Sequence, residues 1–254
     1  MTVISWIGLG HMGSPMSANL VEAGHTVRGF DLDERAMATA RDGGVETFSS
    51  MAEALEGAEV VFTMLPKGEH SRAVYLGDQG VLALAPKDAL LIDSSTIDVE
   101  TALELHKAAA EKGFAFVDAP VSGGISGAAA GTLTFMIGGD KDTVARAEQV
   151  ITPMAGRIVH TGGPGMGQSA KIVNNMMLFV NLEACAEGSV LAAKDVGLAM
   201  SAGEQTGVDL PAAELAAQRF QRLIDEGYGD LDCSLIVKYA APDGKVQGWN
   251  PDEV

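Results

Sequence analysis

The chain has few positive charges, and this shortage limits the partners it can bind. Among its 254 residues, 17 lysine and arginine residues stand against 34 aspartate and glutamate residues, a formal net charge of -17. An excess of this size repels nucleic-acid backbones and anionic membrane surfaces. We therefore expect neither a nucleic-acid partner nor a membrane partner.

Cysteines, long apolar runs and metal-ligand patterns are also scarce. Cys185 and Cys233 could form one bridge at most, and we expect two reduced thiols. No apolar run reaches the length that spans a bilayer, and the N-terminal residues lack the features of a secretory signal. The five histidines show no metal-ligand spacing. These absences predict a cytoplasmic protein that binds no metal.

Short apolar runs alternate with amphipathic stretches through the first part of the chain. The runs typical of buried strands are residues 3–7, 26–30, 60–64, 89–92 and 115–117, extended by 132–137 and 157–160. Alternation of strands and helices at this spacing implies right-handed crossovers and a mostly parallel sheet covered on both faces. Residues 1–162 are therefore predicted to form a doubly wound α/β domain of the Rossmann type.

The pattern changes after the glycine-rich turn at residues 161–165. Residues 166–193 contain few turn formers and are predicted to form one long interdomain helix, and a further helical pattern covers 212–226. No convincing strand pattern follows. Residues 163–254 are therefore predicted to form an all-helical domain.

A glycine-rich turn follows the first predicted strand. Its residues are Gly8, Leu9, Gly10, His11, Met12 and Gly13. Gly8 allows a tight turn, Gly10 lets a pyrophosphate approach the backbone, and Gly13 lets the next helix pack on the strand. A purely structural turn could share this spacing, but the flanking strand and the helix predicted after it favour a dinucleotide-binding loop.

Asp31 closes the second predicted strand, where such domains carry an acidic residue. Its carboxylate can accept hydrogen bonds from the adenosine ribose and would repel the 2′-phosphate of NADP. Arg28 and Arg35 are nearby cations that could accommodate that phosphate. NAD is therefore the expected cofactor, with NADP as the less favoured alternative.

Two later strand ends should face the same ligand, because ligands of such sheets bind beyond the carboxyl ends of the strands. They are residues 63–66 and 93–96. Each of these short sequences is also typical of an ordinary loop. Thr96, two residues before Asp98, could simply begin a helix.

Lys171 is the candidate acid/base. On a helix it shares a face with Asn175, four residues on, and with Asn174, three residues on. Hydride transfer from an alcohol needs a group that accepts the hydroxyl proton, and desolvation can lower the pKa of a lysine enough for this role. The alternative is an ordinary surface lysine. Its apolar surroundings, and asparagines that a substrate could satisfy, favour the catalytic interpretation.

A second concentration of small polar residues consists of Ser122, Gly123 and Gly124. A hydroxyl group and unobstructed backbone N–H groups could bind a substrate carboxylate. A plain turn explains the same residues.

The order of four motifs resembles the β-hydroxyacid dehydrogenase family. These motifs are residues 8–13, 118–124, 165–175 and 194–195, and they cover nearly the whole chain. Within that family, Asp31 and residues 64–66 and 70–77 look most like the branch that oxidises 3-hydroxyisobutyrate. Lysine at position 171 counts against the imine reductase branch.

The resemblance implies roles for individual residues. Lys171 would be the general acid/base; Ser122, Gly123 and Asn175 would hold the substrate; Leu65, Pro66, Thr96 and Lys194 would line the nicotinamide side. The neighbouring residues Gly124 and Asn174 are added to the expected substrate site from the residue patterns described above. The implied reaction is NAD-dependent oxidation of a small 3-hydroxy acid, preferably 3-hydroxyisobutyrate, to its semialdehyde, in a homodimer or homotetramer assembled through the helical domain. Reduction of tartronate semialdehyde would use the same residues and is the alternative.

One departure from the family concerns the helical part. Family members carry further helices before the Lys-Asp motif, whereas here Ala192 and Ala193 run directly into Lys194. The predicted domain at 163–254 is thus shortened at 193/194, which would leave the substrate pocket and the helical dimer contact incomplete. A catalytically silent NAD-binding scaffold protein is the competing hypothesis that follows.

Overall fold

The computed structural model describes residues 1–185 and 211–228, with isolated positions at 194, 197, 198, 200, 201, 204, 207 and 209. Cys233 and the predicted helical residues 186–193 lie outside this part of the chain. The chain divides into two compact units, Met1–Asn174 and Asn175–Val254. The division falls inside the long helix, so the first turns of that helix belong with the first unit.

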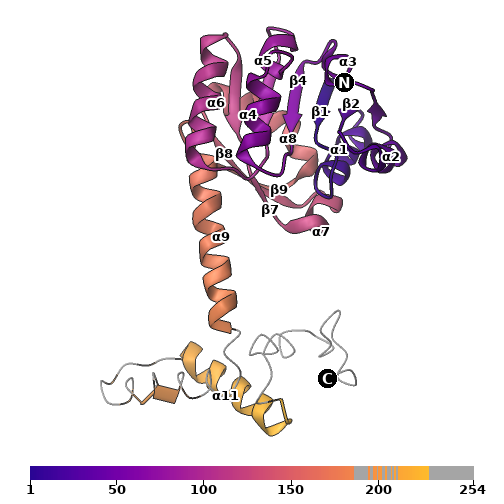
Figure 1. The fold of residues 1–254 in the computed structure, drawn as a ribbon. Coiled ribbons are helices and arrows are strands. Elements are labelled where there is room, and N and C mark those ends of the chain that lie inside the picture. The colour runs from indigo at the N-terminus through magenta and orange to yellow at the C-terminus, as the bar shows by residue number, and fades with distance from the viewer. Residues whose placement is uncertain are drawn as a thin grey trace. The chain divides into compact units, whose positions relative to one another are not determined.

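A nine-stranded sheet forms the centre of the first unit (Figure 1). Its strand order is β3-β2-β1-β4-β5-β6-β8-β7, and β9 pairs with β8. The pairs from β3 to β6 are parallel, β8 runs antiparallel to β6 and β7, and β9 runs parallel to β8. The strands are β1 (Val3–Ile7), β2 (Thr26–Phe30), β3 (Glu46–Thr47), β4 (Val60–Thr63), β5 (Leu90–Asp93), β6 (Ala115–Asp118), β7 (Val121–Ser122), β8 (Leu133–Gly138) and β9 (Ala155–Gly162).

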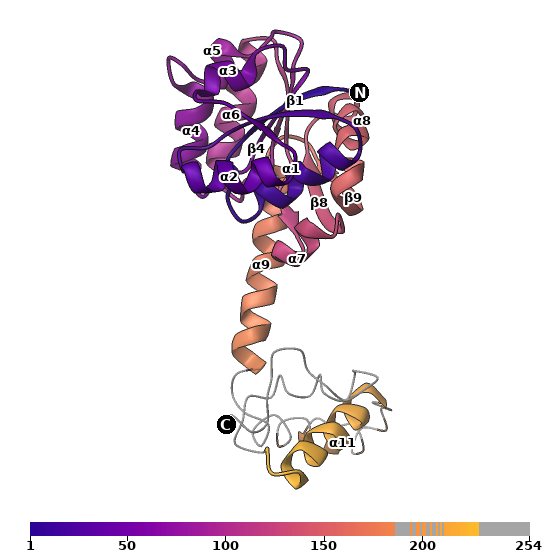
Figure 2. The same cartoon turned by 90° about the vertical axis from the view of Figure 1, so that its right-hand side faces the viewer.

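Helices cover both faces of the sheet (Figures 1 and 2). Those of the first unit are α1 (Gly13–Glu22), α2 (Glu34–Asp42), α3 (Met51–Leu55), α4 (Gly68–Leu76), α5 (Val81–Leu84), α6 (Val99–Glu111), α7 (Gly124–Ala129) and α8 (Lys141–Ile151), with a 3-10 turn at Thr152–Met154. Helix α9 (Met166–Cys185) crosses the division between the units, and α11 (Pro211–Asp225) lies in the second.

The core consists of two clusters, one on each face of the sheet. Strand residues alternate between them: Val60 and Phe62 pack with α1, α2 and α8, whereas Val61 packs with α3 to α6. This alternation is expected of strands that are buried on both faces. The doubly wound Rossmann-type fold predicted from the sequence is confirmed, and all seven predicted strands are present with small shifts at their ends. The two-residue strands β3 and β7 were not predicted, because two residues carry no periodicity.

Aspartates begin several helices of the first unit. Asp33, Asp98 and Asp140 each accept a hydrogen bond from a backbone N–H in the first turn of α2, α6 and α8. Thr101 donates side-chain and backbone hydrogen bonds to Asp98, and Thr143 does the same to Asp140. These bonds lower the pKa of both carboxyl groups. Charged caps of this kind satisfy N–H groups that the helix itself leaves unpaired.

The described residues contain no helix that is both long and apolar enough to cross a membrane. Over the same residues, no three histidine, cysteine or acidic side chains gather as a metal site.

Candidate functional site

The glycine turn between β1 and α1 has two tightly constrained positions and one open position. Gly8 has a φ of +96°, and a Cβ atom there would collide with the carbonyl oxygen of Met64. A Cβ at Gly13 would collide with the carbonyl oxygen of Gly8. At Gly10, by contrast, a Cβ would have no described atom within 4 Å. The turn therefore closes against the protein at its two ends and leaves open space at its centre.

The turn is supported from the core by Trp6. Its indole Nε1 donates a hydrogen bond of 2.9 Å to the carbonyl oxygen of Gly8, and its ring stacks on Phe62 with 4.8 Å between centroids. Within residues 1–185, no side chain caps the N-terminus of α1, and the first turn of that helix has no acidic residue. Uncapped N–H groups and the positive end of the helix dipole are what a pyrophosphate requires.

Asp31 is held rigidly beside the turn. The backbone N–H of Leu9 donates to Oδ2 over 2.7 Å, and the N–H of Asp33 donates to Oδ1 over 2.8 Å. A cavity of about 740 Å³ opens at this point. Five predicted cofactor residues line it: Leu9, Gly10, His11, Asp31 and Pro66.

Residues outside the predicted cofactor site also line this cavity. Arg35, noted only as a nearby cation, lines it from α2, and Ile125 lines it from α7. Helix α7 is joined to α1 by a hydrogen bond of 2.7 Å from the amide of Asn19 to the carbonyl oxygen of Ala128. No local pattern in the sequence indicates this long-range contact.

The loops after β4 and β5 are joined by buried polar side chains. Asp93 accepts hydrogen bonds at Oδ1 from the Thr63 hydroxyl (2.8 Å) and from the N–H of Ser95 (3.0 Å). The Ser95 hydroxyl in turn accepts a hydrogen bond of 2.8 Å from the N–H of Leu65. Burial raises the pKa of the Asp93 carboxyl. These bonds fix the place of Leu65, while Thr96 is exposed beside them.

Lys171 lies in the second turn of α9 and is only 8% exposed. Burial lowers the pKa of its amine, because an ammonium loses hydration there. Asn174 is exposed and Asn175 is half-buried on the same helix. The structure describes Lys194 as a single exposed residue of the second unit, so its place on the nicotinamide side stays a prediction.

Ser122, Gly123 and Gly124 connect β7 to α7. Ser122 pairs with Thr134 of β8, and the two glycines have φ values of +135° and +65°. Both glycines are exposed, and a Cβ at Gly124 would meet nothing within 4 Å among the described residues. The backbone here is accessible to a ligand.

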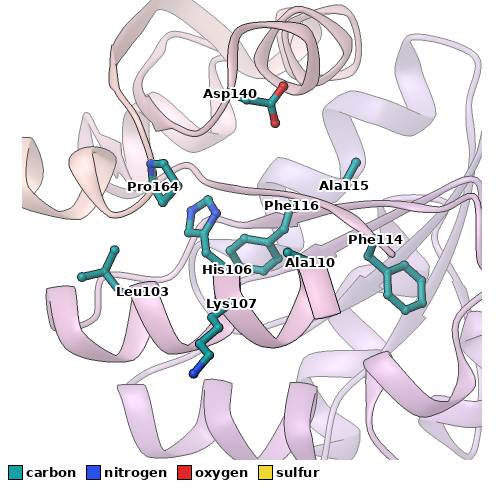
Figure 3. A pocket seen from close by; sticks show the side chains of 9 residues that line it. All are labelled: Leu103, His106, Lys107, Ala110, Phe114, Ala115, Phe116, Asp140 and Pro164. Carbon is teal, nitrogen blue, oxygen red and sulfur yellow. The ribbon is translucent and has the colours of Figure 1, made fainter. Parts of the chain in front are cut away.

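A second cavity, of about 380 Å³, lies between α6 and the start of α8 (Figure 3). Its lining contains none of the predicted site residues. It does contain His106, whose Nε2 is 2.7 Å from Oδ1 of Asp118. Sequence reasoning gave no role to this histidine, because its partner lies on a different element and no motif includes it.

Residues 3–162 match the family described as the NAD binding domain of 6-phosphogluconate dehydrogenase. With the open glycine turn and the strand order, this match defines a nicotinamide-dinucleotide-binding Rossmann protein.

Individual relatives refine that class. A probable 3-hydroxyisobutyrate dehydrogenase of Mycobacterium tuberculosis is 54% identical over 194 residues, 76% of this chain and 65% of that protein. An NAD-dependent L-serine dehydrogenase of Pseudomonas aeruginosa is 34% identical, with 95% of this chain and 99% of that protein covered. The solved structure of the Mycobacterium tuberculosis 3-hydroxyisobutyrate dehydrogenase with L-serine has a TM-score of 0.71 at 40% identity, covering 94% of this chain and 99% of that one. The chain belongs to the β-hydroxyacid dehydrogenase family.

The relatives contain residues that this chain lacks, which concerns the predicted shortening of the helical domain. The chain spans 65% of the length of the mycobacterial 3-hydroxyisobutyrate dehydrogenase. The alignment with the L-serine dehydrogenase has 294 positions, more than the 254 residues of this chain, so that relative has residues with no counterpart here. The position of the shortening, predicted at 193/194, stays a prediction.

Proposed function

We propose that the protein is an NAD-dependent dehydrogenase that oxidises a small 3-hydroxy acid to its semialdehyde, with Lys171 as general acid/base. The observation that carries the proposal is the state of this side chain, 8% exposed and with a lowered pKa. Its helix begins at the carboxyl ends of β5 and β6, the edge of the sheet where a dinucleotide binds. A buried amine at that edge has the chemistry of a proton acceptor.

The residues present fit a bound dinucleotide. The space at Gly10, the uncapped start of α1 and the cavity beside Asp31 together provide room and N–H donors for a pyrophosphate and acceptors for a ribose. When bound, NAD supplies the hydride acceptor. We infer a preference for NAD over NADP from the carboxylate of Asp31, although Arg35 lines the same cavity.

The protein's own side chains perform the remaining steps. The neutral amine of Lys171 accepts the proton of the substrate hydroxyl at Nζ. At the same time a hydride leaves the carbon that carries this hydroxyl, so that a carbonyl group forms. In the reverse direction the ammonium returns that proton. Ser122 and the N–H groups of Gly123 and Gly124 bind the substrate carboxylate, assisted by Asn174 and Asn175. The nicotinamide is lined by Leu65, Pro66, Thr96 and Lys194 in this proposal.

The names of the relatives suggest the substrate class. 3-Hydroxyisobutyrate and L-serine are both carboxylates with a hydroxyl group on C3, and they differ in the substituent at C2. We favour 3-hydroxyisobutyrate, since the relative of highest identity reported above carries its name. Reduction of tartronate semialdehyde is the alternative reaction. A panel of 3-hydroxyisobutyrate, L-serine, D-glycerate and 4-hydroxybutyrate, run with NAD and with NADP, distinguishes these substrates.

Replacement of Lys171 by methionine tests the proposed acid/base. We expect kcat for the best substrate to fall by about 10²- to 10⁴-fold, the usual contribution of such a group. The affinity for NAD, measured by calorimetry, should stay as in the wild type. Lys141→Met, an exposed lysine at the start of α8, is the matched control and should retain full turnover.

Two outcomes would contradict the proposal. Near-normal turnover of Lys171→Met would remove the assigned role. Tight NAD binding by the wild type with no turnover of any hydroxy acid would favour the silent scaffold protein. Assembly into a dimer or tetramer through residues 163–254 is a separate expectation, which light scattering of the whole chain tests.

A further inference from the structure

The carboxylate of Asp118 joins segments that are far apart in the sequence. The side chain is 1% exposed at the carboxyl end of β6. Its Oδ1 is 2.7 Å from Nε2 of His106 on α6 and accepts the backbone N–H of Gly165 over 2.9 Å. Its Oδ2 accepts the N–H of Gln168, also over 2.9 Å. Asp118 thus caps the start of α9 and is itself held by a histidine.

Gln168 carries the same network to the loop after β5. Its side-chain amide donates to the carbonyl oxygen of Ser95 over 2.7 Å, and its Oε1 accepts the N–H of Ile97 over 3.1 Å. Thr96, predicted beside the nicotinamide, lies between these two residues. Lys171 follows Gln168 by less than one helical turn. The network therefore holds the helical turn that carries Lys171, the proposed acid/base, against the loop after β5 that contains Thr96.

Close packing leaves this junction little freedom to shift. A Cβ at Gly167 would be 2.5 Å from the carbonyl oxygen of Asp118 and 2.6 Å from that of Met136. The His106 ring packs edge-on against Phe116 at 4.7 Å between centroids, at the cavity shown in Figure 3. A histidine held in this way offers its Nε2 to Asp118 in one fixed direction.

We propose that His106 and Asp118 are positioning residues for Lys171. His106 orients the Asp118 carboxylate, the carboxylate holds the first turn of α9, and that turn sets the place of Nζ relative to the substrate hydroxyl. The proposal rests on the proposed function of Lys171. Misplacement of a catalytic group by about 1 Å can cost on the order of 10²-fold in rate.

The test compares His106→Leu, which removes the donor, with His106→Gln, whose amide can still donate to Asp118. We expect kcat to fall by about 10- to 100-fold in the leucine variant, with the affinity for NAD unchanged, and to recover in the glutamine variant. The acidic limb of the kcat/KM profile should move to higher pH in the leucine variant, because a looser α9 hydrates Lys171 and raises its pKa toward the ordinary value. Lys107→Gln, which alters the next residue of α6 in the same cavity, should change none of these quantities.

A second measurement keeps this test independent of turnover. Acetic anhydride labels neutral amines, so the pH dependence of Lys171 labelling, read by peptide mass spectrometry, reports its pKa whether or not a substrate is known. A higher labelling pKa in His106→Leu than in the wild type or His106→Gln would support the proposal even if the proposed reaction were wrong. An unchanged labelling pKa and kcat would overturn it. Loss of NAD binding in His106→Leu would also overturn it, because the network would then maintain the fold and not Lys171.

Discussion

The N-termini of α1 and α9 meet the carboxyl edge of the sheet in opposite ways. Among the described residues, α1 has no side-chain cap and no acid in its first turn. At α9, both oxygens of Asp118 accept N–H groups from the first turn and the residue before it. The first helix end is left for an anion from outside, and the second is occupied by an anion of the protein itself. A helix N-terminus is therefore a binding site only where the fold leaves it unoccupied.

Glycine has opposite uses at the same two places. At Gly10 the missing side chain leaves a space that no described atom fills, whereas at Gly167 it allows backbone segments to touch. Adding one methyl group to each should separate the two uses, because one change affects a ligand and the other affects the fold.

The largest effect is expected at the closed junction. Gly167→Ala places a methyl group against the carbonyl oxygens of Asp118 and Met136, and we expect the free energy of unfolding to fall by about 3 kcal/mol. Urea denaturation of the whole chain measures it. Gly163→Ala, where a Cβ would meet no described atom within 4 Å, is the control and should leave stability nearly unchanged. Equal stability of the two variants would show that the junction can relax.

An intermediate effect is expected at the open turn. Gly10→Ala should weaken NAD binding by about tenfold, equivalent to about 1.4 kcal/mol, because the methyl group takes space meant for the pyrophosphate. The urea midpoint should stay as in the wild type. Calorimetry that found full NAD affinity would contradict the assignment of this space to the cofactor.

The smallest effect is expected at α8, whose N-terminus is capped by its own Asp140. Asp140→Ala should lower the free energy of unfolding by about 1 kcal/mol at pH 7. Because the pKa of Asp140 is lowered in the folded protein, this contribution is present above the unfolded pKa of about 4 and is lost as the pH falls through the folded value. Denaturation at pH 7 and pH 3 measures the change.

A matched variant isolates the charge of this cap. Asp140→Asn keeps a capping oxygen but cannot titrate, so its stability should lose this part of the pH dependence. If Asp140→Ala were as stable as the wild type at pH 7, the cap would contribute nothing.

The two helix ends also differ in how far the sequence predicts them. The glycine turn and Asp31 lie within one β-α-β segment, so their spacing alone indicated the turn, the helix after it and the acidic partner. The junction at α9 depends on Asp118, whose hydrogen-bond partners His106, Gly165 and Gln168 lie 12, 47 and 50 residues away in the chain. No local pattern records contacts between residues so distant in the chain.

Lys171 shows the same limit in a single residue. The sequence singled it out for its apolar neighbours, yet Ile172 and Val173 are 42% and 51% exposed. Lys171 is buried although these neighbours are exposed, and it follows Gln168, which is hydrogen-bonded to Asp118 and Ser95 of the first unit. The sequence pattern around Lys171 does not contain these long-range hydrogen bonds.

Trp6, one of two tryptophans in the chain, gives the glycine turn an optical property. The indole is fully buried and is hydrogen-bonded to the carbonyl oxygen of Gly8. Indole fluorescence depends on such hydrogen bonds, and reduced nicotinamide absorbs light at the wavelengths where tryptophan emits. We therefore expect the emission of Trp6 to fall when a reduced nicotinamide dinucleotide binds at the turn, so that this side chain would act as a built-in reporter of binding.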